Sequence, residues 1–368
     1  MKVLSSKDKL NGAINIVSRA ASKSLIVSQD GIKLDAYDNS LVLSGSNLEI
    51  EIIVTLECEV EEEGKAVLNS RMLGDIVKKS SGKEISIEIL DNYLTKIKSG
   101  SSKFEITGFS PDESSKFLDF NAQHFIKISK NKLRQMITNT VFSVSSDANK
   151  PVLTGCFFEI KKNFIKMVAI DGFRMAIRVA QLDEDYESNC FIVPCKVLLE
   201  LSRILKDENE YVNVSYSDSR VAFSFDNCTV ISRLIEGKYI DYERIIPKGK
   251  TTVFNFNTFK LLKIIERVAI VITSDSNRSP IKFLFKNDSL NISCKTSCGF
   301  SEDSIEIEPK DFELEIGFNH RFLIDALKAC ETEEVCLSFD SSITPLTITP
   351  IYGDSFCYIV LPVRLKTV

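Results

Sequence analysis

The stretch VLSSKDKL (Val3–Leu10) decides the fold, because the chain contains its pattern three times. IKISKNKL begins 123 residues later at Ile126, and FNFNTFKL begins a further 128 residues on, at Phe254. In each copy a short strand-like run leads into apolar residues at the four-residue step that is typical of an amphipathic helix. Recurrence at this spacing predicts three tandem copies of one domain plan.

A second amphipathic helix recurs later in each copy. Its three versions are VLNSRMLGDI (Val67–Ile76), IVPCKVLLEL (Ile192–Leu201) and GFNHRFLIDA (Gly317–Ala326). Short strands follow each of them, as in the alternating run ISIEI (Ile85–Ile89). Each third therefore holds two helices and several strands, which predicts an α+β chain of three domains of roughly 120 residues each. We place the domains at residues 1–122, 123–248 and 249–368.

No motif for catalysis, metal binding or membrane insertion stands out in the sequence. The ten cysteines contain no C-x-x-C pair and there are only two histidines, so we expect reduced cysteines that act as apolar fillers. Phosphate-binding loops, nucleophile elbows and H-E-x-x-H helices are absent from the sequence. No run approaches the ~20 apolar residues of a membrane helix, and the first residues are charged where a signal peptide is apolar. We therefore expect a cytoplasmic protein without cofactor, metal or membrane attachment.

The six helical segments are basic, although the whole chain has a net charge of −5. Together they carry nineteen basic and five acidic residues, a net charge of +14, whereas the remaining residues carry −19. Ordinary surface helices mix both signs, often as Glu–Lys pairs four residues apart. The segregation favours a surface of helices that faces duplex DNA through its phosphates and without sequence preference. The alternative, that exposed helix faces simply collect lysine, stays open at this point.

Five further stretches occur in register across the repeats. They are PVLTG (Pro151–Gly155), AIDGFRMA (Ala169–Ala176), DYERIIP (Asp241–Pro247), EIGFN (Glu315–Asn319) and LPVRL (Leu361–Leu365). With these stretches the chain resembles, over its whole length, the bacterial DNA polymerase III β subunit family, the replication sliding clamps. The resemblance implies three clamp domains, each of two helices plus antiparallel sheets, and a head-to-tail homodimeric ring whose helices line a hole for double-stranded DNA.

The same resemblance implies a polymerase processivity factor, an accessory subunit with no catalytic residues of its own. Its partners would be the DNA polymerase catalytic subunit, the clamp loader and other proteins with a clamp-binding motif. Two alternatives are a divergent paralogue that acts as a protein-interaction scaffold and an enzyme with an unrecognised active site.

The family places a partner-peptide groove between the second and third domains, beside the C-terminal strand. Apolar walls would bury an anchor side chain, worth roughly 1.5–3 kcal/mol, with Arg174 and Arg364 as polar handles at the rim. Ile170, Phe173 and Met175 replace the family's usual Thr, His and Leu, which predicts a more apolar groove. By position the groove residues are Leu153, Ile170, Gly172, Phe173, Arg174, Met175, Ile240, Ile245, Ile359, Leu361, Pro362, Val363 and Arg364, with Phe322 and Pro345 at a shallower second subsite.

DNA contacts and the subunit contact are assigned less directly. Lys23 and Arg71 fall near family positions for DNA contact. By charge alone the further candidates are Lys78, Lys79, Lys130, Lys132, Lys196, Arg203, Lys260 and Lys263. At the subunit contact we place Phe104 and Ile106 against Ile270 and Val271, although both pairs would also fit a domain core. Ser24–Ser28 and Ser114–Asp119 lack the family's prolines, which leaves the loops of the first domain open.

Overall fold

The computed structural model describes residues 1–21, 31–47, 49–111, 121–206, 210–247, 252–273, 279–308 and 313–365. Along these residues the predicted order occurs three times: a strand and a helix first, a second helix later, and then further strands. Lys23, Ser24–Ser28 and Ser114–Asp119, which carried predictions, lie outside the described residues.

Each repeat contains two α-helices among short strands, which confirms the predicted α+β class. The first repeat comprises β1 (Lys2–Ser6), α1 (Lys7–Val17), β2 (Gly31–Tyr37), β3 (Ser40–Ser46), β4 (Ile50–Glu57), β5 (Glu59–Glu62), β6 (Gly64–Asn69), α2 (Ser70–Lys79), β7 (Glu84–Ile89), β8 (Leu94–Ser99) and β9 (Ser102–Thr107). The second comprises β10 (His124–Ser129), α3 (Lys130–Thr138), β11 (Gly155–Ile170), β12 (Arg174–Pro194), α4 (Cys195–Ile204), β13 (Tyr211–Tyr216), β14 (Arg220–Phe225) and β15 (Cys228–Arg233), with 3-10 turns at Val141–Ser143, Pro151–Leu153 and Tyr242–Arg244. The third comprises β16 (Thr252–Asn257), α5 (Thr258–Val268), a 3-10 turn at Ala269–Val271, β17 (Ile281–Lys286), β18 (Ser289–Lys295), β19 (Phe300–Glu306), β20 (Glu313–Phe318), α6 (His320–Lys328), β21 (Glu334–Phe339), β22 (Leu346–Pro350) and β23 (Phe356–Val360).

Polar caps fix where the helices begin. The side-chain oxygens of Asn69 and Asn319 accept backbone N–H groups from the first turns of α2 and α6. Asn257 caps α5 in the same way. Pro194 directly precedes α4, where its missing N–H costs no helical hydrogen bond. The chain therefore changes from strand to helix within one residue.

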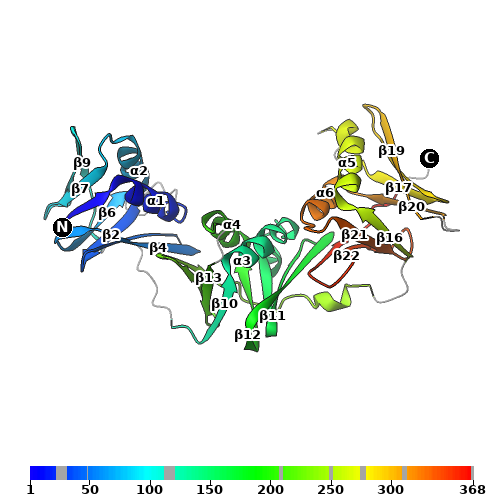
Figure 1. Ribbon diagram of the computed structural model, residues 1–368, viewed down its shortest axis with the longest axis horizontal. Helices are drawn as coiled ribbons and strands as arrows, with labels where there is room; N and C mark the ends of the chain where they lie inside the picture. The colour runs from blue at the N-terminus through cyan, green and yellow to red at the C-terminus, as the bar shows by residue number, and fades with distance from the viewer. Residues whose placement is uncertain are drawn as a thin grey trace. The chain divides into compact units, whose positions relative to one another are not determined.

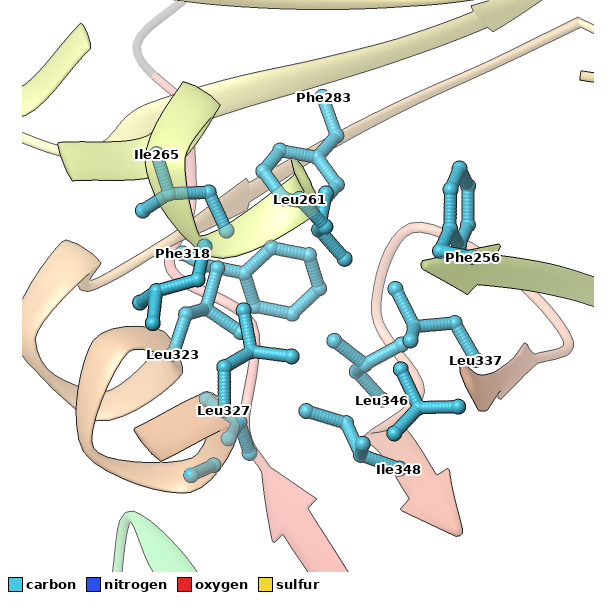
Figure 2. Packing of buried hydrophobic residues seen from close by; sticks show 14 of the residues in the cluster. Phe256, Leu261, Ile265, Phe283, Phe318, Leu323, Leu327, Leu337, Leu346 and Ile348 are labelled. Atoms are coloured by element: carbon cyan, nitrogen blue, oxygen red, sulfur yellow. The ribbon is translucent and has the colours of Figure 1, made fainter. Parts of the chain in front are cut away.

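The third repeat shows how the apolar helix faces build the core. Helices α5 and α6 lie side by side (Figure 1) and turn Leu261 and Leu323 toward Phe283 and Phe318 of the neighbouring strands (Figure 2). The two phenylalanine rings meet nearly edge to face with centroids 5.4 Å apart. All four side chains are at most 1% exposed. The opposite helix faces are left for charged residues.

The described chain divides into two compact units, each of which spans more than one repeat. One unit contains residues 1–131 and 200–234, and the other contains residues 132–199 and 235–368. The second repeat is thus divided between the units, because each half of it shares a sheet with a neighbouring repeat. The proposed domain boundaries after residues 122 and 248 stay predictions.

Each unit contains one junction at which strands of two repeats pair. In the first unit β15 pairs antiparallel with β4 inside an eight-stranded sheet of order β10-β13-β14-β15-β4-β3-β2-β6, and we call this pairing the first junction. In the second unit β23 pairs antiparallel with β12 inside a six-stranded sheet of order β11-β12-β23-β22-β21-β16, and we call this pairing the second junction. The first unit also contains a five-stranded sheet that ends at β9, and the second unit a four-stranded sheet that ends at β19. Within the described ranges no helix is long and apolar enough to cross a membrane.

Candidate protein-binding groove and nucleic-acid interface

A tight loop joins β11 to β12 at the second junction. Asp171 Oδ1 accepts the backbone N–H groups of Phe173 and Arg174 at 2.9 and 3.0 Å, which closes an Asx turn. Gly172 has a φ of +93°, a backbone conformation that residues with a Cβ rarely adopt. The loop therefore holds Phe173 in one place, with 63% of its surface exposed.

The C-terminal segment after β23 runs between this loop and β20. The Leu361 N–H donates to the Phe173 carbonyl at 2.9 Å, and the Val363 N–H donates to the Gly317 carbonyl at 2.8 Å. Pro362, which has no N–H to donate, stands between these two bonds. A Cβ on Gly317 would lie 2.8 Å from the Val363 carbonyl oxygen, so the glycine of EIGFN makes this close approach possible.

The groove residues divide into a buried floor and an exposed wall. Leu153, Ile170, Met175 and Ile359 are 2–5% exposed and pack in one cluster with Tyr239 and Tyr242. The structure thus brings together four residues that lie up to 206 positions apart in the sequence. The exposed wall consists of Phe173, Ile240, Ile245 and Val363, with Leu361 and Pro362 half-buried.

Hydrogen bonding and ring stacking hold the tyrosines of the floor. The Tyr242 hydroxyl donates to Glu159 Oε2 at 2.6 Å, and the Tyr239 ring stacks on Phe157 with centroids 4.9 Å apart. Burial raises the pKa of both tyrosines, so their hydroxyls stay protonated donors. The floor is a rigid base for the exposed residues above it.

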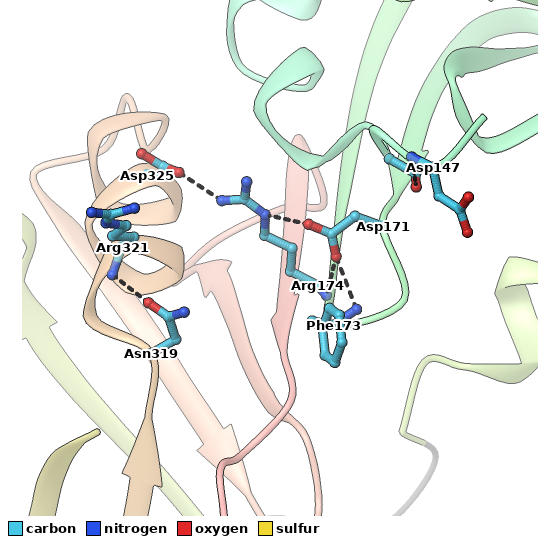
Figure 3. Close-up of polar contacts among 8 residues, drawn as sticks. Asp147, Asp171, Phe173, Arg174, Asn319, Arg321 and Asp325 are labelled. Carbon is cyan, nitrogen blue, oxygen red and sulfur yellow. Dashed lines mark hydrogen bonds and ion pairs between the residues drawn. The ribbon is translucent and has the colours of Figure 1, made fainter. Parts of the chain in front are cut away.

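Arg174 is not a free handle at the rim, and this part of the sequence prediction is wrong. Its Nε donates to Asp171 Oδ2 at 2.9 Å and its Nη1 to Asp325 Oδ2 at 2.6 Å (Figure 3). The guanidinium carbon lies 4.5 Å from the ring centre of Phe322, and the side chain is only 13% exposed. Two carboxylates and an aromatic ring contact the Arg174 guanidinium, because a mostly buried charge requires partners. Arg364 is exposed and remains the candidate rim cation.

A cavity of about 610 Å³ lies alongside the C-terminal segment. Its lining includes Glu315 and Gly317 of β20, Val363 and Arg364 of the C-terminal segment, and Ile343. Ile343 is 81% exposed and was not among the sequence candidates. It lies in a polar connecting stretch with no periodicity, so no sequence signal marked it. Pro345, the predicted second-subsite residue, is half-buried two positions further on and does not line this cavity.

Most basic candidates on the helices are exposed. Arg71, Lys78 and Lys79 on α2 and Lys260 on α5 are exposed and form no ion pair within the described part of the chain. Other candidates are exposed but already interact with residues of the chain. Lys132 donates to the Gln181 carbonyl at 3.0 Å, and Lys196 has an interaction partner. Arg203 pairs with Glu200, and Lys263 pairs with Glu266 at 2.7 Å. A cation without an ion-pair partner can contact a phosphate without first losing an existing interaction.

Lys130 is wrong as a DNA candidate. Its side chain is 1% exposed, and Nζ lies 2.5 Å from Glu210 Oε2 and 2.6 Å from Asp226 Oδ1. It is the first residue of α3, and the first residue of α5, Thr258, is also buried. The first residue of these helices points into the protein interior, so a charged side chain there must form ion pairs within the chain.

The repeats identify cations that the charge count did not single out. Lys9, Lys132 and Lys260 are the third residues of α1, α3 and α5, and all three are exposed. The second residues of α2, α4 and α6 are Arg71, Lys196 and Arg321, and the ninth residues are Lys78, Arg203 and Lys328, again all exposed. Positions seven residues apart on a helix share one face. Lys9, Arg321 and Lys328 are thus new candidates, which aligning the three copies residue by residue would have found.

The subunit-contact candidates lie at the ends of two sheets. Phe104 is half-buried on β9, while Ile106 of the same strand is 9% exposed and belongs largely to the core. Ile270 is 76% exposed in the turn after α5. That turn lies next to β19, because the Ser301 hydroxyl donates to the Val268 carbonyl at 2.7 Å. The exposed candidates therefore accompany the two terminal strands β9 and β19.

Comparison with known proteins gives one consistent result. The family models for the N-terminal, central and C-terminal domains of the DNA polymerase III beta subunit match residues 1–117, 127–241 and 243–364. The beta sliding clamp of Staphylococcus epidermidis is 31% identical over 97% of this chain and 96% of its own. The DNA polymerase sliding clamp structure from Bacillus subtilis has a TM-score of 0.96, with 31% identity and full coverage of both chains. A putative DNA polymerase III beta subunit from Eubacterium rectale has a TM-score of 0.93 with 30% identity, over 99% of this chain and all of its own.

Proposed function

Because the chain belongs to the DNA polymerase III β subunit family, the bacterial sliding clamps, we propose that two copies close head to tail into a ring around duplex DNA. The chain is a polymerase processivity factor, an accessory subunit rather than a catalyst. The proposal concerns how its residues build the ring, contact DNA and hold partners.

The single observation that carries the ring is the repeated strand junction. At the first junction β15, the last strand of the second repeat, pairs with β4 of the first repeat. At the second junction β23, the last strand of the third repeat, pairs with β12, which corresponds to β4. The same rule would pair β9, the last strand of the first repeat, with β19, the counterpart of β4 in the third repeat. Both strands end their sheets, so a second copy can supply the missing partner.

The internal junctions also suggest a register for the proposed contact. Cys228 pairs with Val54 in the first junction, and Phe356 pairs with Arg178 in the second. In the hairpin pairings Cys228 takes the position on β15 that Ser102 takes on β9, and Val54 takes the position on β4 that Asp303 takes on β19. The pairings of the third repeat likewise relate Phe356 to Ser102, and those of β12 relate Arg178 to Asp303. Lys103 of one copy would then lie opposite Glu302 of the other, and opposite charges on facing strands favour pairing. Because a head-to-tail contact joins two different surfaces, two such contacts close a ring of six domains.

The basic helix positions support contact with DNA phosphates. The same exposed positions are basic in all three repeats, and they carry arginine and lysine without the aromatic platforms of single-strand binders. Phosphate contacts carry no sequence information, so a ring held by them can slide. Topology then keeps the protein on DNA, and we place the protein in the cytoplasm with the chromosome.

The groove at the second junction supports tethering of partners. Its exposed wall is apolar above a rigid floor, which suits a short apolar segment with a polar neighbour for Arg364. The polymerase catalytic subunit, the clamp loader and other proteins with such a segment would compete for it. The loader would also supply the energy for opening the ring.

Retention on DNA tests the ring directly. The protein is loaded onto nicked circular duplex by a bacterial clamp loader with ATP, and the sample is filtered by size at high salt. The ring predicts that the protein stays with the circle and is lost once a restriction enzyme linearises it. Equal loss from circular and linear DNA would reject topological binding. Sedimentation of the free protein should show a dimer, and a monomer at micromolar concentration would reject the proposed β9–β19 contact.

A further inference from the structure

Arg174 connects two parts of the second unit that are 151 positions apart in the sequence. Nη1 reaches Asp325 on α6, and Nε reaches Asp171 in the loop between β11 and β12 (Figure 3). Charge-assisted hydrogen bonds of this kind are the strong ones, and 13% exposure of the arginine side chain protects them from screening. The contact therefore fixes the distance between the loop and the helix.

Helix α6 contributes a wall to the groove through Phe322. The Phe322 ring lies under the Arg174 guanidinium, and its centroid is 6.4 Å from that of Phe173 in a stacked arrangement. Phe173 is the exposed aromatic of the loop, and its carbonyl holds the C-terminal segment through Leu361. A shift of α6 would separate the two rings, so their spacing depends on what ties α6 to the loop.

The described residues of the first junction show no such tie. Glu200 on α4 occupies the position that corresponds to Asp325, and it also binds an arginine of the preceding repeat. That arginine is Arg19, which follows α1 and not the hairpin loop. The position of Arg174 is taken there by Ile50, which is 7% exposed and carries no charge. A carboxylate at this helix position is thus common to both junctions, but among the described residues it is linked to the hairpin loop at the second junction alone.

We propose that Asp325 is a positioning residue of the peptide groove, which acts through Arg174 to hold Phe322 at the spacing from Phe173 that a partner's apolar side chain requires. The inference rests on the proposed function of the groove and adds the element that controls its width. Asp325 need not touch the partner. The Asp171 bond keeps Arg174 paired on one side when Asp325 is lost, so the protein can fold without the tie.

The test compares peptide affinities of full-length variants. The probe is a fluorescein-labelled peptide with the clamp-binding segment of the cell's own replicative polymerase, followed by fluorescence anisotropy. Asp325→Asn, which keeps shape and removes charge, should weaken binding about 5- to 20-fold, because the weakened tie leaves part of the binding free energy to be spent on restoring the spacing of Phe173 and Phe322. Asp325→Glu should restore part of the affinity. The matched control is Glu313→Gln, which breaks an exposed ion pair with Lys286 in the same unit and should change nothing.

A double-variant cycle separates positioning from general stability. Arg174→Gln alone should weaken binding, and adding Asp325→Asn to it should cost little more, because the two residues act as one tie. Equal affinity of Asp325→Asn and the unchanged protein would overturn the inference, as would full additivity in the cycle. If the variants lose affinity only in proportion to their loss of melting temperature, Asp325 contributes to general stability and not to positioning of the groove. If the unchanged protein fails to bind the peptide, the groove itself is wrong, which is a different result.

Discussion

The first and second junctions have equivalent backbone hydrogen bonds but different exposed side chains. In both, a side-chain oxygen at the start of the hairpin loop, from Asn47 or Asp171, accepts two backbone N–H groups of that loop. In both, a residue at or directly past the end of the last strand donates its N–H to a loop carbonyl, Arg233 to Glu49 at 3.2 Å and Leu361 to Phe173 at 2.9 Å. The backbone arrangement around the candidate groove, a hairpin loop hydrogen-bonded to the end of the last strand, therefore occurs at both junctions.

The side chains on that frame differ in kind. Glu49 and Arg233 are exposed at the first junction, where the second has Phe173 and Leu361. Below them Glu51 takes the hairpin position that Met175 takes in the groove. An apolar peptide that covered the charged rim and buried carboxylate of the first junction would have to desolvate charges, which is unfavourable. At the second junction it would bury only apolar surface. The comparison teaches that composition, and not backbone geometry, makes one junction a candidate binding site.

Truncating the apolar rim should have the largest effect on binding. We expect Leu361→Ala combined with Val363→Ala to weaken peptide binding about 10- to 100-fold, because each removes apolar area that the peptide would cover. Titration calorimetry measures this directly. Arg233→Ala, at the position that corresponds to Leu361 in the first junction, is the matched control and should leave the affinity unchanged. An unaltered affinity in the double variant would show that the groove lies elsewhere.

Glu51 makes the first junction sensitive to pH. Burial raises the pKa of Glu51 to about 7, although the charges of Lys33 and Arg220 oppose the shift. A carboxyl with a raised folded pKa costs stability as it ionises, so its penalty appears as the pH rises from about 4.5 to 7 and persists above. We expect Glu51→Gln to raise the free energy of unfolding by about 1–2 kcal/mol at about pH 8, with little gain at about pH 5. Urea unfolding at both pH values checks this, and an equal gain at both would contradict the assignment.

The proposed third junction can be tested by exchanging charges. Lys103→Glu alone and Glu302→Lys alone should each weaken the dimer about 3- to 10-fold, because each creates like charges on facing strands. The two changes in one chain should restore it. Sedimentation equilibrium reports the dissociation constant, and Lys238→Glu, at an exposed residue of the second repeat that lies on neither strand, is the control. If the double variant is no tighter than either single one, the register derived from the internal junctions is wrong.

Much of this architecture is predictable from the sequence because each copy repeats the same local pattern. The strands and helices lie where alternation and the four-residue step predict them. The burial of Lys130 was not predicted, since a charge count does not tell which helix face a residue occupies. The Arg174–Asp325 pair was missed for a different reason: no local pattern relates residues 151 positions apart.

Charge removal from α2 should have the smallest effect at ordinary salt. Arg71→Ala with Lys78→Ala removes two exposed cations with no ion-pair partner in the described chain, and should lower affinity for linear duplex a few-fold. The slope of log affinity against log salt should fall by about 2, one unit for each phosphate that the protein no longer neutralises. Arg203→Ala, whose charge Glu200 already neutralises in part, should change the slope less. Equal slopes for the α2 double variant and the unchanged protein would remove α2 from the DNA surface.

Hydrogen exchange with and without the polymerase peptide tests most directly whether side chains alone distinguish the two junctions. Both carry equivalent backbone amides in the hairpin loop and at the end of the last strand, so each serves as the internal standard for the other. The account predicts slower exchange around Phe173, Arg174 and Leu361 when the peptide is bound, with no change around Glu49, Ile50 and Arg233. Equal protection at both junctions, or protection at neither, would contradict it.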